Sequence, residues 1–170
     1  MILLATDESL RKLITIRAIQ ILIISLIALL VAQIFKFVLY SIKEKKFKWR
    51  LLISTGGFPS SHSSFCVSLV ITLGMFQWHD LNGTLDWSFV VAVVFSIIVI
   101  HDAMGVRLEA SKHAKILNRI ASNLTDDEKE SLGYGKKGVL KEMLGHKATE
   151  VLGGIAVGVI IGLIGFFIVV

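Results

Sequence analysis

Residues 55–64 read TGGFPSSHSS and run directly into the apolar stretch FCVSLVITLGMF at residues 65–76. The first of these segments holds the only proline of the chain, two adjacent glycines, four serines and a histidine. Pro59 followed by serine is typical of a helix start, which needs no ligand. Backbone amides and hydroxyls at a helix N-terminus also form a natural anion site, to which His62 adds a proton carrier. Taken alone, the segment supports both interpretations equally.

The composition is that of a membrane protein. Of the 170 residues, 54% are hydrophobic and 18% are charged, and the mean hydropathy is +0.75, whereas soluble domains carry about 25% charged residues. Polar residues 6–17 precede the first long apolar segment without a secretory cleavage pattern, so we expect that segment to remain as an anchor. The single Cys66 lies in an apolar run and is expected to be buried.

Four apolar segments approach or reach the length of about 20 residues that is needed to cross a bilayer. These predicted spans cover residues 18–39, 60–76, 87–104 and 151–170. The sequence therefore predicts one all-α membrane domain over residues 1–170, a polytopic helical bundle with about four transmembrane helices. Residues 1–17 show helical spacing and predict a leading or interfacial helix.

The polar stretch at 105–150, between the last two spans, predicts short interfacial helices. Residues 107–121 have a helical composition, and Thr125 with Glu128 matches a capping box that starts a second short helix. The following run GYGKKG lacks the pattern of a phosphate-cradling P-loop, so we interpret it as a flexible connector. Residues 139–144 resume a helical pattern.

The last span carries glycines at a spacing of four residues, namely Gly154, Gly158 and Gly162. Such a face of small residues permits close helix packing in membranes. Its partner could be another span of this chain or the same helix of a second subunit. The sequence therefore leaves open a homo-oligomer formed through these glycines.

Because four spans alternate in direction, the polar residues at their ends meet on one membrane face. The residues placed there include Lys36, His62, Arg107 and His146. The two loops on this face hold five and nine Lys or Arg residues, whereas the loop at 77–86 on the other face holds none. By the positive-inside rule, the face with the polar residues is predicted to be cytoplasmic.

His146 and Glu150 stand four residues apart at the start of the last helix and therefore share one helix face. The carboxylate can accept a hydrogen bond from one imidazole nitrogen, which fixes the tautomer and leaves the other nitrogen free to attack. A helix-start histidine beside a solvated glutamate is the alternative. The pair therefore predicts an oriented nucleophile or a simple helix start.

Three segments in this order carry a family resemblance: TGGFPSSHSS, HDAMGVRLEASKHAKILN and LKEMLGHKATEVLGG. They resemble the divergent type-2 phosphatidic acid phosphatase family, and the resemblance runs from about residue 33 to residue 162. That family is related to the lipid phosphate phosphatases and the vanadium haloperoxidases, which are helical proteins with a shared phosphate pocket. The resemblance therefore implies a helical fold with a phosphate site.

The resemblance also implies roles for the residues at the matching positions. Ser60 and the amide of Ser61 would hold phosphate oxygens, and His62 would protonate the leaving oxygen. His146 would be the nucleophile, oriented by Glu150. This scheme requires no metal and no other cofactor.

The phosphate-binding cations match the wider superfamily less closely. Its first motif, a lysine followed seven residues later by arginine and proline, fits Lys43 and Arg50, but Leu51 replaces the proline. Lys36 is an equal candidate for the same duty, although a lysine near the end of a span commonly extends to the hydrated interface.

A further arginine of the superfamily pattern falls on Leu140, so we expect Arg107 to supply that charge from a different helix. Asp102 has no place in the scheme. It could anchor Arg107 or His62, or bind a cation.

The sequence thus predicts an integral membrane phosphatase that hydrolyses a lipid phosphate or pyrophosphate through a phosphohistidine. A lipid-phosphate binding or transport protein that uses the same pocket without turnover is the alternative, which the leucine at position 140 favours. A structural protein whose polar loop contacts a partner or anionic lipid is the third hypothesis. The expected partners are the lipid phosphate substrate and membrane lipids, with no nucleic acid.

Overall fold

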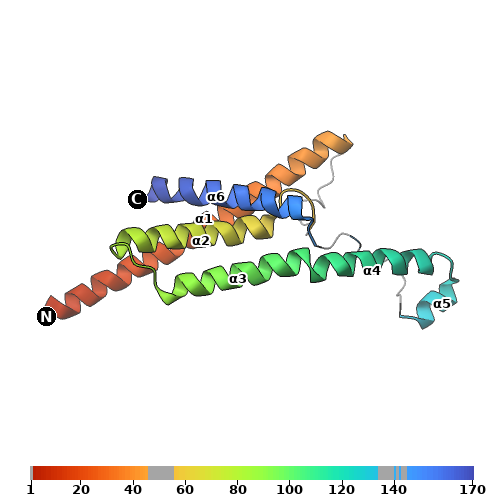
Figure 1. Cartoon of the computed structure of the whole chain (residues 1–170), viewed down its shortest axis with the longest axis horizontal. Coiled ribbons are helices and arrows are strands. Elements are labelled where there is room, and N and C mark those ends of the chain that lie inside the picture. The colour runs from red at the N-terminus through yellow and green to blue at the C-terminus, as the bar shows by residue number, and fades with distance from the viewer. Residues whose placement is uncertain (1, 46–55, 134–139, 141, 143–144) are drawn as a thin grey trace.

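The computed structural model describes residues 2–45, 56–133, 140, 142 and 145–170, and it confirms the all-α class. The helices are α1 (Ile2–Glu44), α2 (Ser61–Asp80), α3 (Trp87–Met104), α4 (Val106–Ala121), α5 (Asp126–Ser131) and α6 (Ala148–Val169). Figure 1 shows α2, α3 and α6 running side by side, with α1 crossing them at an angle. Both termini lie toward the same end of the bundle, and α4 continues α3 beyond the other end.

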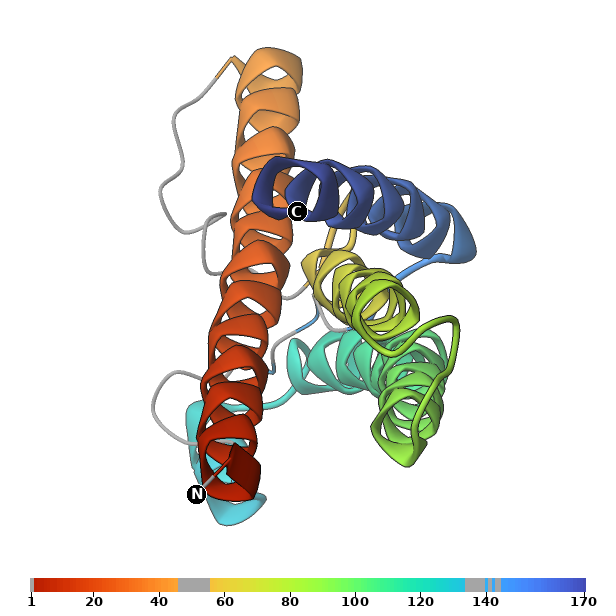
Figure 2. The same ribbon diagram turned by 90° about the vertical axis from the view of Figure 1, so that its left-hand side faces the viewer.

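Three stretches of the described residues are long and apolar enough to cross a membrane. They are Glu8–Lys43, Trp87–Ala121 and Ala148–Val169. The predicted span at 60–76 corresponds to α2, which is 20 residues long but is not among these three because serines and a histidine lower its hydropathy. The polar character of α2 fits its position, since Figure 2 shows it between α6 and α3, with α1 alongside. The more apolar helices therefore surround a polar central helix.

The predicted leading helix at residues 1–17 is not a separate element from the predicted span at 18–39. Both belong to one continuous helix, α1, of 43 residues. The chain has no glycine or proline before residue 56, so no residue removes a donor from the helical hydrogen-bond ladder or loosens the backbone.

Local signals set the bounds of the next helices. Helix α3 covers the predicted span at 87–104, and the Asp86 side chain accepts a hydrogen bond from the Ser88 amide at its start. Helix α5 begins with the predicted capping box, in which Thr125 and Glu128 each bond the other's backbone N–H. Short polar motifs thus determine where these helices begin.

The helix predicted at 139–144 is wrong at its two described residues, Leu140 and Glu142, which are not helical. The Asn118 side chain accepts from the backbone N–H of Leu140 at 2.8 Å and donates to its carbonyl at 2.9 Å. These bonds to α4 replace intrahelical ones. The rest of that prediction, and the connector from residue 134 onward, lie outside the described residues.

The glycines at 154, 158 and 162 are buried against α2 of the same chain. A Cβ atom added at Gly158 would lie 2.6 Å from the Ser64 carbonyl oxygen, and one at Gly162 would lie 3.1 Å from Ile71 Cβ. At Gly154 it would collide with the Ser60 carbonyl. This face therefore packs within the chain, and a homo-oligomer through it remains a prediction that would require α2 to be displaced.

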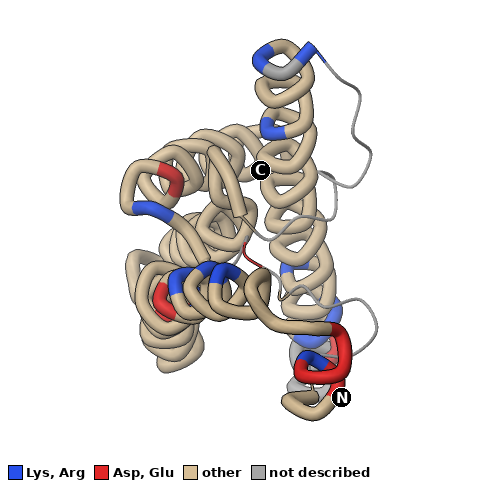
Figure 3. The backbone as a smooth tube through the Cα atoms, turned by 90° about the vertical axis from the view of Figure 1, so that its right-hand side faces the viewer, with Lys and Arg blue, Asp and Glu red and all other residues tan. Residues whose placement is uncertain are grey.

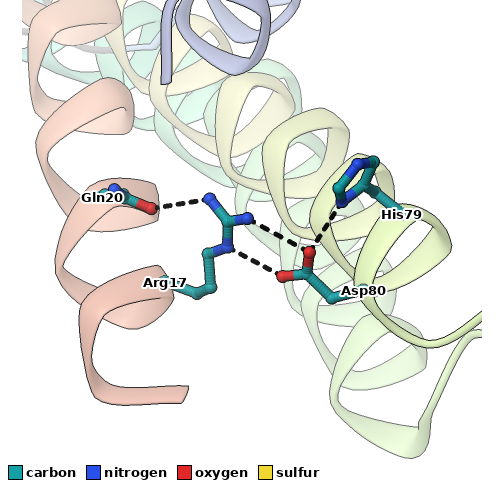
Figure 4. A network of polar contacts seen from close by, with 4 residues as sticks. All are labelled: Arg17, Gln20, His79 and Asp80. Atoms are coloured by element: carbon teal, nitrogen blue, oxygen red, sulfur yellow. Dashed lines mark hydrogen bonds and ion pairs between the residues drawn. The ribbon is translucent and has the colours of Figure 1, made fainter. Parts of the chain in front are cut away.

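An ion-pair network ties α1 to α2 at the end of the bundle opposite the α2 N-terminus (Figure 4). Arg17 donates to Asp80 from Nε at 2.8 Å and from Nη2 at 3.1 Å. Its Nη1 donates to Gln20 at 3.1 Å, and the Asp80 carboxylate also contacts Nδ1 of His79 at 2.7 Å. The guanidinium lies 4.4 Å from the centroid of the Phe76 ring, so the pair is anchored to the core as well.

Candidate functional site

The N-terminus of α2 is capped by its own serines. Ser60 accepts from the Ser63 amide at 3.3 Å and from the Ser63 hydroxyl at 2.9 Å, and its side chain is fully buried. Both contacts use Ser60 as an acceptor, so neither of them uses its own hydroxyl proton. The amide of Ser61 is the first of α2 and has no intrahelical acceptor. The helix start and an anion site are therefore compatible here.

The α2 N-terminus is joined to the first turn of α6. The backbone N–H of Ser60 donates to the carbonyl of Glu150 at 2.8 Å. Since this bond uses the Ser60 amide, only its hydroxyl can reach a phosphate oxygen. The same bond places the serines beside the residues at the start of α6.

His146 is held by three elements. Its ring nitrogen Nδ1 lies 3.0 Å from Oε2 of Glu150, and its backbone N–H donates to the Ala103 carbonyl at the end of α3 at 2.9 Å. The preceding Gly145 has a φ of +76° and lies directly against the backbone of Arg107 and Leu108. A side chain there would be strained and would collide with α4, so glycine allows the histidine to reach this corner.

The imidazole of His146 has one engaged and one unused nitrogen. The ring is 1% exposed, and among the residues that the structure describes Nε2 has no partner at hydrogen-bond geometry, although a looser interaction with the backbone of Gly57 raises the pKa of the ring. Because a carboxylate accepts from Nδ1–H, the tautomer assigned by this bond leaves a lone pair on Nε2. This is the geometry of an oriented nucleophile.

Burial lowers the pKa of His146 below its ordinary value of 6.5, and the charge of Lys36 adds to the effect. The hydrogen bond and the charge of Glu150 oppose the shift, as does the backbone of Gly57. The net result favours the neutral ring near pH 7, in which Nε2 can attack.

His62, in the first turn of α2, lies close to His146. The ring centroids of His62 and His146 lie 6.3 Å apart, and the two planes are tilted by 57°. His62 is half-buried and lies within electrostatic reach of Arg107, Lys36 and Asp102. Two histidines 84 positions apart in sequence, one in α2 and one just before α6, thus meet at one site.

Arg107 and Asp102 form an ion pair at the α3–α4 corner beside His62. Nε of Arg107 lies 2.5 Å from Oδ2 of Asp102, and the side chains are 50% and 38% exposed. This contact uses one of the five N–H donors of the guanidinium. Asp102 was expected to contact Arg107, His62 or a cation, and the structure shows the ion pair with Arg107.

Lys36 is fully buried, which excludes the alternative that it extends into water. Its Cδ atom lies 3.5 Å from where a Cβ at Gly57 would be, and its charge acts on both His146 and Glu150. A buried ammonium beside two histidines provides positive charge for an anion. Figure 3 views this end of the bundle, where charged residues gather on α4, α5 and the start of α6.

Of the other two candidate cations, the structure describes only Lys43. Lys43 lies exposed in the last turn of α1, and Arg50 lies outside the described residues. The structure adds Gly57 and Tyr40, which the sequence reasoning did not select. Gly57 has a φ of +98°, and a Cβ there would lie 3.2 Å from the Tyr40 ring. The adjacent glycines at 56 and 57 were the only sequence signal for this close approach.

The sequence matches the divergent PAP2 family over residues 18–161, a range that contains His62, His146 and Glu150. The chain is also similar to the uncharacterized membrane protein YuiD of Bacillus subtilis (strain 168). The two are 34% identical over 146 residues, which cover 82% of this chain and 89% of that protein. No solved structure matches the chain.

Proposed function

Since the chain belongs to the divergent PAP2 family, we propose that this membrane protein is a phosphatase acting on a lipid phosphate or pyrophosphate. The observation that carries the proposal is the buried Nε2 of His146, which has no partner at hydrogen-bond geometry, with Glu150 on Nδ1 and the His62 ring centroid 6.3 Å away. Phosphoryl transfer asks mainly for positioned charge, an in-line nucleophile and an acid for the leaving group. The site has a residue for each duty.

In the first step, the Nε2 lone pair of His146 attacks phosphorus while the bond from phosphorus to the leaving oxygen breaks. Protonated His62 gives its proton to that oxygen, and the phosphoryl group remains on His146. In the second step, neutral His62 takes a proton from water, which attacks phosphorus and releases inorganic phosphate. His146 is then free for another cycle.

The charges around the phosphoryl oxygens come from Lys36 and Arg107, and hydrogen bonds come from the Ser60 hydroxyl and the Ser61 amide. Asp102 holds Arg107 at the corner of α3 and α4. The site lies at the end of membrane helices, where a substrate with an apolar tail places its phosphate. Fourteen Lys or Arg residues in the two loops on this side, five and nine, support a cytoplasmic site.

A lipid-phosphate binding or transport protein is the second candidate. The observation that favours it is Leu140, which stands where the superfamily has a further arginine and is bonded to Asn118 instead. Without that cation, the negative charge of the phosphoryl transition state is stabilised less. The remaining cations can still bind the phosphate of the ground state.

The test is phosphate release from purified protein in detergent, supplied with glycerolipid and isoprenoid phosphates. Turnover should be lost in His62→Ala and His146→Ala and kept in His113→Ala, whose imidazole is exposed on α4. Binding without turnover, dependent on Ser60 and Arg107, would instead identify the binding protein. If neither His62→Ala nor His146→Ala changes binding or turnover, the site itself is wrong.

A further inference from the structure

A second concave feature lies away from the histidines, on the flank of the bundle. It is a groove of about 560 Å³ between α2, α3 and α6, and its lining is apolar except for His79. The main lining residues are Val70, Gly74 and Trp78 of α2, Phe89 of α3, and Phe166 and Phe167 of α6. Lipid-sized and drug-sized pockets in proteins occupy about 300–1,000 Å³, so this volume suits an apolar ligand.

The groove exists because α3 packs on α2 and barely touches α6. At Gly74 the Phe89 ring comes so close that an added Cβ would lie 2.8 Å from it, which draws α3 onto α2. On the other side, Phe166 packs edge-on against Phe167 and His79, with ring centroids 5.4 Å and 6.1 Å apart. Aromatic rings thus form two walls with α2 as the floor.

The depth of the groove in the membrane follows from the helix rise. Val70 and Trp78 lie about 12 Å and about 24 Å beyond His62 along α2, at 1.5 Å per residue. One leaflet of the hydrocarbon core is about 15 Å thick. With His62 at the hydrocarbon boundary, most of the groove lies in the opposite leaflet, and Trp78, 63% exposed, lies toward the headgroups of that leaflet.

We propose that this groove binds one acyl chain of a phospholipid from that opposite leaflet. The groove is open and lies between α3 and α6, which belong to stretches long and apolar enough to cross a membrane. Hydrocarbon chains are therefore the molecules that reach it, and its apolar wall matches them along its length. The polar end of the lipid lies beside His79 and Trp78, which are amphipathic side chains suited to the interface. The chain fills the gap between α3 and α6 and joins them. This inference does not depend on phosphatase activity.

The experiment measures quenching of Trp78 fluorescence by phosphatidylcholine brominated in its acyl chains. The full chain carries Trp49→Phe and Trp87→Phe, so that Trp78 is the single fluorophore, and it is titrated in mild detergent. Val70→Phe fills the groove, and Val94→Phe is the matched control because Val94 is exposed on α3 and does not line the groove. Both variants add the same atoms to a membrane helix.

We expect quenching that saturates at one lipid per protein. Val70→Phe should weaken the apparent affinity about tenfold or more, as overfilling a packed site does, and Val94→Phe should leave it unchanged. Quenching that rises without saturation and equally in all three proteins would show ordinary boundary lipid and overturn the proposal. Reduced turnover of a long-chain but not a short-chain lipid phosphate in Val70→Phe would also overturn it, because the occupant would then be the substrate tail.

Discussion

At the scale of single residues, His146 combines burial with an unused nitrogen. An unsatisfied buried polar atom costs about 1–3 kcal/mol, and such atoms in native structures call for an explanation. Here the Nε2 atom of His146 is buried without a partner at hydrogen-bond geometry, the ring of His62 lies 6.3 Å away between centroids, and Glu150 holds the other nitrogen. The proposed role of His146 as the nucleophile would account for both features.

Replacing Glu150 by Gln tests the orienting bond. The amide can still accept from Nδ1–H, but it lacks the charge that stabilises a protonated or phosphorylated ring, so kcat should fall by about 10²–10⁴. Because Glu150 raises the pKa of His146 against the effect of burial, its removal should move the acidic limb of the kcat/KM profile to lower pH. Glu109→Gln, at an exposed glutamate of α4, is the control. If the acidic limb of the kcat/KM profile does not move in Glu150→Gln, Glu150 does not influence the titration of His146 and the proposed orienting role is wrong.

Replacing Lys36 by Met distinguishes a functional charge from a structural one. Lys36 interacts electrostatically with Glu150, and removing one partner of a buried charge pair destabilises a protein, so thermal stability should fall in this variant. Phosphate binding should weaken by about 10–100-fold, since a charge-assisted contact is lost. Lys12→Met, at an exposed lysine of α1, should do neither. Strong destabilisation with unaltered phosphate binding would make Lys36 structural.

At the scale of elements, the contact of α6 with α2 depends on residues without side chains. Gly158→Leu should lower the free energy of unfolding by about 1–3 kcal/mol or more, because the new side chain meets Ser64 and Val67. Ala156→Leu, at an exposed position on the same helix, should have little effect. Unfolding can be followed through reaction of the buried Cys66 thiol as it becomes exposed. Equal stability of both variants would contradict the packing.

The link between α1 and α2 depends on Arg17 and Asp80, which are 18% and 15% exposed. In a double-mutant cycle with Arg17→Ala and Asp80→Ala, we expect a coupling energy of about 1–3 kcal/mol. The reaction of the Cys66 thiol during unfolding measures this coupling energy as well. Additive effects of the two substitutions would mean that the pair contributes no stability beyond each residue alone.

At the scale of the whole molecule, α4 and the turn between α2 and α3 lie at opposite ends of the bundle (Figure 1). Cysteines placed at Lys115 and Asn82, both exposed, should therefore react with an impermeant thiol reagent from opposite sides of the membrane. The cysteine at Lys115 should react from the cytoplasmic side. The parent protein gives the background, because its single cysteine is buried. Labelling of both positions from one side would refute the arrangement.

Much of the fold could be predicted because its signals are local. The bounds of α3 and the capping box at Thr125 depend on neighbouring residues, and so does the spacing of His146 and Glu150. The continuous helix α1 was missed because a change from polar to apolar composition was interpreted as a boundary, although no helix-breaking residue stands there.

The remaining features depend on contacts between distant residues. The rotation of α1 about its axis decides whether Lys36 faces lipid, water or the site, and one sequence does not fix that rotation. The pairing of the glycine face with α2, and of Arg17 with Asp80, likewise depends on which helices become neighbours. Alternation of spans predicted that His62 and His146 share a face, while their distance of 6.3 Å came from packing.

The most direct test of the account is to trap the phosphohistidine. Protein incubated with a lipid phosphate labelled on phosphorus is quenched in base, where a phosphohistidine survives, and the label is then released in acid. The parent protein and His113→Ala should both carry the label, and His146→Ala should carry none. In His62→Ala, any phosphoryl group that is transferred should accumulate, because water is no longer activated to remove it. Label that persists on His146→Ala, or phosphate release by that variant at the parent rate, would contradict the assignment of His146 as the nucleophile.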